Sequence, residues 1–245
     1  YKAFNREGFH FGTDDLDAGV VATHYINDIP FDVFLNRFPY LQSHTLIVPD
    51  RKFGDKPQNI DPNNQADISI LEAMMKLCQN SDLGDKMRIA YNGQGAHASV
   101  NHLHFHGFEI NPKCIPPIEE YIQNKGNSHV TLDEYIRGAE WFPEKDISVG
   151  VPNFIRDIFI RNNFGEPLTY NLYMTPKGVA CIPRLHQNTP SYVNTMIESN
   201  ISSGFAFAEL AGVLIAPSEE VFKMDDLELL KKYNLVKDAI QIRTH

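Results

Sequence analysis

Three histidines alternate with apolar residues in one short stretch of the chain, Asn-His-Leu-His-Phe-His-Gly-Phe-Glu-Ile at residues 101–110. Side chains two residues apart leave the same face of a β-strand, so His102, His104 and His106 are expected to form one imidazole-bearing face. Imidazole is costly to bury without a partner, and three of the chain's ten histidines lie here. The pattern predicts a strand over 100–110 that carries the chemistry of the protein.

Composition narrows the class of protein. At 245 residues and 42% hydrophobic content, the chain can bury a large core. A net charge of -9 argues against a surface that holds a nucleic-acid backbone, although a local basic pocket for one phosphate is still allowed. The three cysteines form no CxxC pair, which favours reduced thiols. No run reaches the roughly 18 apolar residues of a membrane span, and the first residues lack the apolar core of a signal peptide. We therefore expect a cytoplasmic protein that contacts neither nucleic acid nor membrane.

Hydrophobic periodicity predicts an α+β fold in which helices flank an antiparallel sheet. Strands are expected where β-branched and aromatic residues are bounded by turn signals, at 19–25, 31–36, 44–49, 87–92, 100–110, 153–161, 168–175 and 179–183. Helices are expected at 63–80, at 131–138 and at 225–240, the last with Leu227, Leu229, Leu230, Tyr233 and Leu235 on its buried side.

The domain organisation is expected to be simple. Residues 1–245 would form one domain, in which two related halves, 1–112 and 143–245, are joined by a polar, proline-punctuated connector at 113–142. The sequence of the strand His44–Pro49 is weakly similar to that of Val179–Arg184, which indicates a duplicated β unit.

A histidine strand suits phosphorus chemistry. A neutral imidazole can attack phosphorus and form a labile phosphoramidate, which splits one hard displacement into two easier ones. Its second nitrogen should be held by a carbonyl or carboxylate, and donors should surround the phosphate oxygens. The small-residue loop 93–99 can supply such donors through its backbone amides, and Gln94 and Ser99 add side chains.

Several motifs together resemble a known family. The run from Asn92 through His-Leu-His-Phe-His at 102–106, preceded by Ser-His-Thr-Leu-Ile-Val-Pro at 43–49, is similar to the histidine triad superfamily of nucleotide hydrolases and nucleotidyl transferases. The segments most similar to its branch of GDP-hexose phosphorylases and diadenosine tetraphosphate phosphorylases, which is galactose-1-phosphate uridylyltransferase-like, are 36–40, 91–96, 98–105 and 170–175. The resemblance extends over about residues 20–215.

The resemblance implies a role for each matching residue. His104 would be the nucleophile that accepts the nucleotidyl group, flanked by His102, which orients its strand, and by His106, which contacts phosphate or the leaving group. The residues implied in nucleotide or phosphate binding are His44, Asn92, Gly93, Gln94, Ser99, Asn36 and Arg37. The implied substrate is a nucleotide sugar or a dinucleoside polyphosphate, and no cofactor is required.

One position departs from the family pattern. The phosphorylase and transferase members usually carry glutamine where this chain has His106, whereas the hydrolases carry histidine. A glutamine can hold phosphate without titrating, while a third imidazole could protonate a leaving group or assist water. The acceptor of the nucleotidyl group, which could be inorganic phosphate, a sugar phosphate or water, is therefore left open.

Two other functions compete with this one. A metal-dependent hydrolase could use the histidine cluster, but the first and third imidazoles of such a strand lie roughly 13 Å apart, and His44 or His97 could complete the site, with His186 more remote. A nucleotide-binding module that has lost turnover is the second alternative. Glu209 resembles a position of the phosphorylase branch, although a charge on an exposed helix face is the simpler interpretation. Base, leaving group and oligomeric state are not fixed by the sequence.

Overall fold

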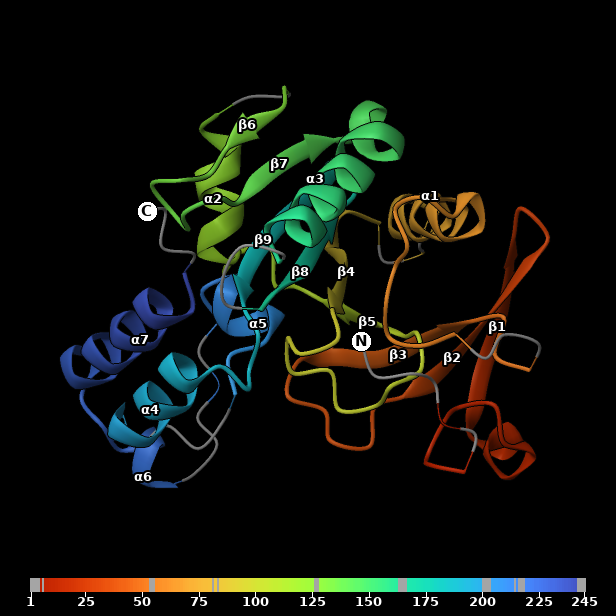
Figure 1. Ribbon diagram of the computed structural model, residues 1–245. Helices are drawn as coiled ribbons and strands as arrows, with labels where there is room; N and C mark the ends of the chain where they lie inside the picture. Colours follow the sequence, from red (N-terminus) through yellow and green to blue (C-terminus); the bar gives the residue numbers. More distant parts are fainter. Residues whose placement is uncertain are drawn as a thin grey trace.

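The computed structural model describes residues 5, 7–52, 56–80, 82, 84–125, 128–162, 167–199, 204–213, 215 and 219–241. Within these residues the chain forms a nine-stranded sheet in which every neighbouring pair is antiparallel. The strand order is β1-β2-β3-β5-β4-β8-β9-β7-β6, and helices cover both faces (Figure 1). The expected α+β class with an antiparallel sheet is confirmed.

The strands and helices of the described residues have the following bounds. The strands are β1 (Val20–Ile26), β2 (Ile29–Leu35), β3 (Gln42–Pro49), β4 (Met87–Asn92), β5 (Phe105–Glu109), β6 (Val130–Thr131), β7 (Glu140–Pro143), β8 (Leu168–Thr175) and β9 (Gly178–Leu185). The helices are α1 (Gln65–Gln79), α2 (Pro117–Gln123), α3 (Ile147–Arg161), α4 (Pro190–Ser199), α5 (Phe207–Leu210), α6 (Glu219–Phe222) and α7 (Asp226–Ile240). None of these helices combines the length and the apolar character that a membrane span requires.

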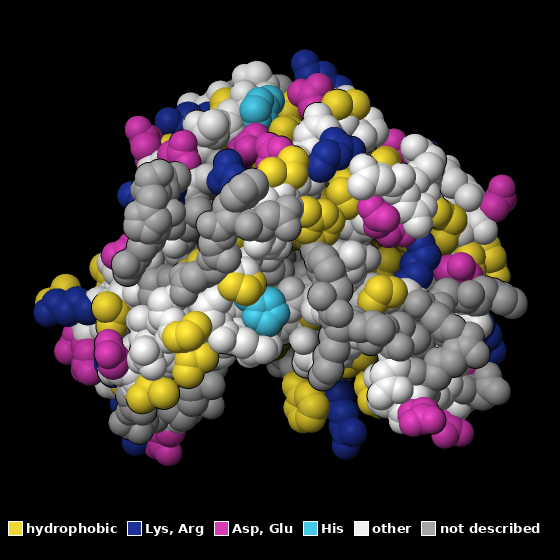
Figure 2. All heavy atoms as spheres, in the orientation of Figure 1, with side chains coloured by type: hydrophobic (Ala, Val, Ile, Leu, Met, Phe, Trp, Pro, Cys, Tyr) yellow, Lys and Arg dark blue, Asp and Glu magenta, His cyan; other side chains and the backbone are white. Residues whose placement is uncertain are grey.

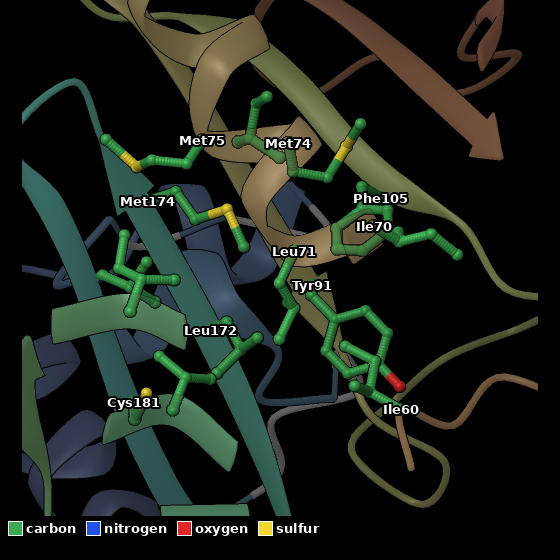
Figure 3. Packing of buried hydrophobic residues seen from close by; sticks show 14 of the residues in the cluster. Ile60, Ile70, Leu71, Met74, Met75, Tyr91, Phe105, Leu172, Met174 and Cys181 are labelled. Carbon is green, nitrogen blue, oxygen red and sulfur yellow. The ribbon is translucent and has the colours of Figure 1, made fainter. Parts of the chain in front are cut away.

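One face of the sheet is closed by α1 and α3. The helix α1 begins where the Asn64 side chain accepts a hydrogen bond from the amide of Ala66, and it buries an apolar stripe against the sheet. Leu71 and Met74 of this stripe belong to the same buried cluster as Leu172 and Met174 of β8 (Figure 3). This cluster is the main core and lies between the central strands and the two helices.

The opposite face carries two smaller clusters with a gap between them. Toward the C-terminal part, Phe108 and Tyr173 pack with residues of α2, α5 and α7, and toward the N-terminal part Phe11 and Phe34 pack with Val48. Figure 2 shows that the molecule is hollowed between the C-terminal helices and the N-terminal strands. His106 stands opposite Ala90 on one side and Leu46 on the other, so the histidine face lies between these two clusters.

Two predicted elements, one in the connector and one in the second half, are wrong. Residues 153–161 were expected as a strand but belong to α3, because Val151, Ile155 and Ile158 form a helical stripe that is buried in the main core. The β-branched isoleucines favour a strand locally, and the burial of one helix face overrides that preference. The expected helix over 131–138 is absent: Thr131 belongs to β6 and residues 133–138 form turns, which close where the amide of Gly138, at a φ of 76°, donates to the Asp133 carboxylate.

The polar stretch at 113–142 is more structured than expected. It contains α2, which begins with Pro117 at its first position and has glutamates in its first turn, and it contributes β6 and β7 to the sheet next to β9. The helix α7 is confirmed, but its buried side consists of Tyr233 and Val236, whereas Leu227 and Leu230 are 62% and 50% exposed and Leu235 is also exposed. The closing segment 205–215 contains α5, and Leu214 lies outside the described residues.

Candidate active site

Only the last part of the histidine segment is a strand, and the backbone bends at Asn101 and His102. β5 begins at Phe105, so His106 lies in the sheet while His102 and His104 precede it, which corrects the strand expected over 100–110. The reason is that β4 ends at Asn92 and the Gln58 side chain takes the place of the missing partner. Its Nε2 donates to the carbonyls of Asn92 and His104 at 2.8 and 3.0 Å, and its Oε1 accepts from the His104 amide at 2.8 Å.

His104 is held in one tautomer. Its Nδ1 lies 2.8 Å from the carbonyl oxygen of His102, and because a carbonyl only accepts, Nδ1 carries the hydrogen and Nε2 carries the lone pair. Burial lowers the pKa of His104 to about 4, against the hydrogen bond to His102, so the ring is neutral at pH 7. A neutral imidazole with a free lone pair is the form that acts as a nucleophile.

The N-terminal segment covers the first two histidines. The Phe11 amide donates to His102 Nδ1 at 3.1 Å, and the Phe11 ring lies 5.8 Å from the His102 ring and 5.4 Å from the His104 ring. Arg51 anchors this segment through a hydrogen bond of 2.9 Å to the Phe11 carbonyl and ion pairs with Asp32 and Asp17. Sequence reasoning missed Phe11 and Arg51, because neither stands in a motif and their position depends on long-range pairing.

His106 belongs to a second group of polar side chains. His44 Nε2 and His106 Nδ1 are 3.1 Å apart, and Asn92 Nδ2 lies 3.5 Å from His106 Nε2. Asn36 Nδ2 contacts the His44 ring at 3.1 Å, and the Tyr40 ring packs edge-on against the same ring. Burial lowers the pKa of His44 to about 4, and burial together with the neighbouring imidazoles lowers the pKa of His106 well below its ordinary value.

The structure places the remaining predicted binding residues apart from this group. The amides of Gly93 and Gln94 donate to the carbonyls of Tyr170 and Gln58, both at 3.0 Å. Ser99 and Gln94 line a cavity of about 730 Å³ together with Gln58, Asn101, His186 and Gln187. Arg37 is exposed and contacts the Phe38 ring. The structure thus brings together His102, His104, His106, His44, Asn92 and Asn36, and the binding roles of Gly93, Gln94, Ser99 and Arg37 stay predictions.

Two further titratable groups lie nearby. Glu209 is buried rather than on an exposed helix face, where its carboxylate accepts from the Ala206 amide at 2.9 Å, and burial raises its pKa to about 7. His97 hydrogen-bonds the Tyr192 hydroxyl, and its amide donates to the Gln187 side chain at 2.7 Å. Among the residues that the structure describes, no group of three His, Cys, Asp or Glu side chains is arranged to hold a metal ion.

Comparisons with known proteins agree with this geometry. Residues 24–109, which include His44, Asn92 and the three clustered histidines, match the HIT domain family. GDP-D-glucose phosphorylase 1 of Danio rerio is 26% identical over 168 residues, which cover 66% of this chain and 44% of that protein. The chain therefore spans less than half the length of this relative.

Solved structures share the fold. The crystal structure of yeast Ap4A phosphorylase Apa2 matches with a TM-score of 0.58 at 16% identity, over 85% of this chain and 70% of that chain. Its complex with Ap4A matches with a TM-score of 0.57 at 18% identity, over 85% and 71%. Residues 24–109 thus match the HIT domain family, and most of the chain shares the fold of the Ap4A phosphorylase structures.

Proposed function

We propose that the chain is a nucleotidyl transferase that cleaves a nucleotide sugar or a dinucleoside polyphosphate through a covalent nucleotidyl intermediate on His104. The observation that carries the proposal is the hydrogen bond from His104 Nδ1 to the carbonyl of His102. It leaves the Nε2 lone pair for attack on phosphorus, and among the described residues no side chain hydrogen-bonds this atom.

The reaction has two displacements. In the first, His104 Nε2 attacks the phosphorus of the nucleotidyl group, the N–P bond forms, and the bond to the bridging oxygen breaks so that a phosphate-bearing fragment leaves as an anion. In the second, an oxygen of the acceptor attacks the same phosphorus, and the N–P bond breaks. The ring is cationic in the intermediate, and the carbonyl of His102 stabilises the hydrogen that stays on Nδ1.

The names of the similar proteins support the substrate class. One relative is a GDP-D-glucose phosphorylase, and one solved structure holds Ap4A in an Ap4A phosphorylase. Both names describe enzymes that open a phosphoanhydride next to a nucleotide, which is the bond that the proposed intermediate requires. Inorganic phosphate is the acceptor that both names imply.

The surroundings support a protected intermediate. His102 and His104 are buried, and Phe11 covers both rings, which limits the access of water to a phosphoramidate on His104.

We further propose a cytoplasmic location, for which the free cysteines Cys78, Cys114 and Cys181 are the support.

A substrate screen tests the proposal. Purified protein is incubated with GDP-hexoses, ADP-sugars and diadenosine tetraphosphate, each with and without inorganic phosphate, and nucleotide products are separated by chromatography. The expected result is turnover of at least one substrate class, which His104→Gln abolishes. His24→Gln is the matched control, because His24 is an exposed histidine of β1 in the same domain. Turnover that survives in His104→Gln would refute the intermediate.

The two competing functions are separated in the same assay. We propose that no metal is required, so chelator treatment should leave turnover unchanged. Loss of turnover on chelation, restored by zinc, would support a metal-dependent hydrolase. Tight nucleotide binding without product from any substrate would support a binding module.

A further inference from the structure

One asparagine sets the hydrogens of the His44–His106 pair. We infer that Asn92 is a positioning residue that holds His106 as a neutral imidazole with its hydrogen on Nδ1, so that His106 acts like a carboxamide and neither donates a proton to the leaving group nor activates water. The consequence for the acceptor rests on the proposed function, whereas the tautomer itself does not.

The side-chain amide of Asn92 has only one allowed orientation. Its Oδ1 accepts from the backbone amide of Phe207 at 3.1 Å and from Asn171 Nδ2 at 2.6 Å. A backbone amide only donates, so the oxygen must face Phe207 and the NH₂ group must face His106. Asn92 therefore presents a donor to His106 Nε2, which has to accept.

The hydrogen of His106 is then forced onto Nδ1. A neutral imidazole carries one hydrogen, and Nε2 cannot hold it while it accepts from Asn92. His106 Nδ1 points at His44 Nε2 at 3.1 Å, so it donates to that atom. His44 Nε2 accepts, and the hydrogen of His44 lies on its Nδ1.

Asn36 lies against the His44 ring without selecting one of its nitrogens. Its Oδ1 accepts from the backbone amide of Phe38 at 3.0 Å, so its NH₂ group faces His44, where Nδ2 is 3.1 Å from Nε2 and 3.3 Å from Nδ1. The position of the hydrogen on His106 is therefore set by Asn92. Adding a proton to His106 Nε2 requires breaking its hydrogen bond to Asn92.

The groups around His106 do not oppose this assignment. The neutral His104 ring, just before β5, lies 5.3 Å away, the Phe207 ring of α5 lies 5.1 Å away, and the His44 ring of β3 lies 5.3 Å away. Glu209, also on α5, is hydrogen-bonded to the Ala206 amide. The lowered pKa values of His44 and His106, caused mainly by burial, agree with a neutral pair.

This arrangement has a consequence for the acceptor. Water must lose a proton as it attacks phosphorus and needs a base, but the lone pair of His106 is already engaged by Asn92. Inorganic phosphate is an anion at pH 7 and attacks without a base. A locked, neutral His106 therefore favours transfer to phosphate over hydrolysis.

The tautomer is measured directly by NMR of protein labelled with ¹⁵N in histidine. The His106 signals are assigned by their loss in His106→Gln. The expected spectrum has a protonated Nδ1 and a non-protonated Nε2, which stay unchanged from pH 8 down to pH 6. A hydrogen on Nε2, or titration near the ordinary histidine pKa of about 6.5, would overturn the inference.

Asn92→Asp is the matching perturbation, because a carboxylate cannot donate. It should place a hydrogen on His106 Nε2 and raise the pKa of His106 beside the new charge, so that the ring titrates between pH 6 and 8. Asn153→Asp makes the same chemical change on the exposed face of α3 and should leave the His106 signals unmoved. Unmoved His106 signals in Asn92→Asp would show that Asn92 does not set the tautomer.

Kinetics provide the second readout. General acid–base groups contribute about 10²–10⁴-fold to a reaction rate. If the imidazole acts as a carboxamide, the rate of phosphorolysis in His106→Gln should therefore fall by less than about tenfold. A larger loss of rate in a folded variant would refute the carboxamide-like role of His106.

The inference and the proposed function fail separately. A protein with the expected tautomer but no turnover contradicts only the function, and an active protein with the other tautomer contradicts only the inference.

Discussion

The carbonyl oxygen of His102 lies 2.8 Å from Nδ1 of His104, and this single contact decides which nitrogen of His104 can react. The contact depends on the backbone between the two residues, which is held at His104 by the Gln58 side chain rather than by a neighbouring strand. The reactive nitrogen is therefore positioned by a side chain that lies more than forty residues away in the sequence.

Gln58 should be essential for this geometry. Gln58→Ala removes three hydrogen bonds and leaves the His104 amide and two carbonyls without their partner, and each orphaned buried group costs about 1–3 kcal/mol. We expect a loss of stability of several kcal/mol and a fall in kcat, measured by urea unfolding and steady-state kinetics. Gln79→Ala, which removes one hydrogen bond to Pro176 at the end of α1, is the control. Equal effects of the two substitutions would contradict the role of Gln58.

Phe11 should protect the intermediate from water. Phe11→Ala uncovers the rings of His102 and His104, so a nucleotidyl group on His104 should be hydrolysed faster in the absence of phosphate. The lifetime of the labelled protein after removal of substrate measures this rate. Phe9→Ala, at a position that is 68% exposed, should leave the lifetime unchanged. An unchanged lifetime in Phe11→Ala would show that the N-terminal segment does not shield the site.

Activity should be nearly independent of pH around neutrality. The pKa of His104 is lowered to about 4, so the nucleophile is neutral at every pH above about 5 and is lost only as the pH falls through 4. The single-turnover rate of nucleotidyl transfer to the protein, measured from pH 5 to 8, should show no pH-dependent rise or limb near pH 6.5. A limb at that pH would mean that His104 titrates as an exposed histidine.

Stability should fall on mild acidification. The buried imidazoles of His44, His97 and His104 have lowered pKa values of about 4, 3 and 4, so the unfolded chain binds more protons below pH 6.5. Their contribution is fully present above that pH and is lost as the pH drops from 6.5 toward 4. Glu209 acts in the opposite direction between pH 4.5 and 7, because its pKa is raised to about 7. Three histidines outweigh one carboxyl, so urea midpoints should be lower at pH 5.5 than at pH 7.5.

Glu209→Gln tests the effect of Glu209 on stability, which opposes the effect of the buried histidines. It removes the carboxyl that binds its proton more tightly in the folded chain, so the loss of stability between pH 7.5 and 5.5 should become steeper than in the unmodified protein. The difference in urea midpoints between the two pH values, compared for both proteins, gives the answer. A shallower dependence would contradict a raised pKa for Glu209.

Short-range patterns predicted much of the fold. The strands around His44 and Met87 and the helices α1 and α7 follow from apolar periodicity and turn residues, and the structure confirms them. The strand expected at 153–161 was wrong because isoleucines favour both strands and buried helices, and only the packing of α3 on β8 and β9 decides between the two.

The candidate site also combines features that the sequence predicts with features that only the fold determines. The period of two in His102, His104 and His106 predicted a shared face, and the ring contacts of Phe11 with His102 and His104 and of His104 with His106 agree with it. Phe11, Gln58 and Arg51 could not be predicted, because each acts through contacts between segments that are distant in the sequence. The hydrogens of the histidines likewise depend on backbone amides that only the fold places.

The covalent intermediate is the central claim, and mass spectrometry of the intact and digested protein tests it most directly. Brief incubation with a substrate from the screen, without acceptor phosphate, should add the mass of one nucleotidyl group to the peptide that contains residues 102–106, and fragmentation should place it on His104. The adduct should be absent from His104→Gln and should disappear when inorganic phosphate is added. A protein that turns over its substrate with no adduct at any time, or with the adduct on His102 or His106, would contradict the account.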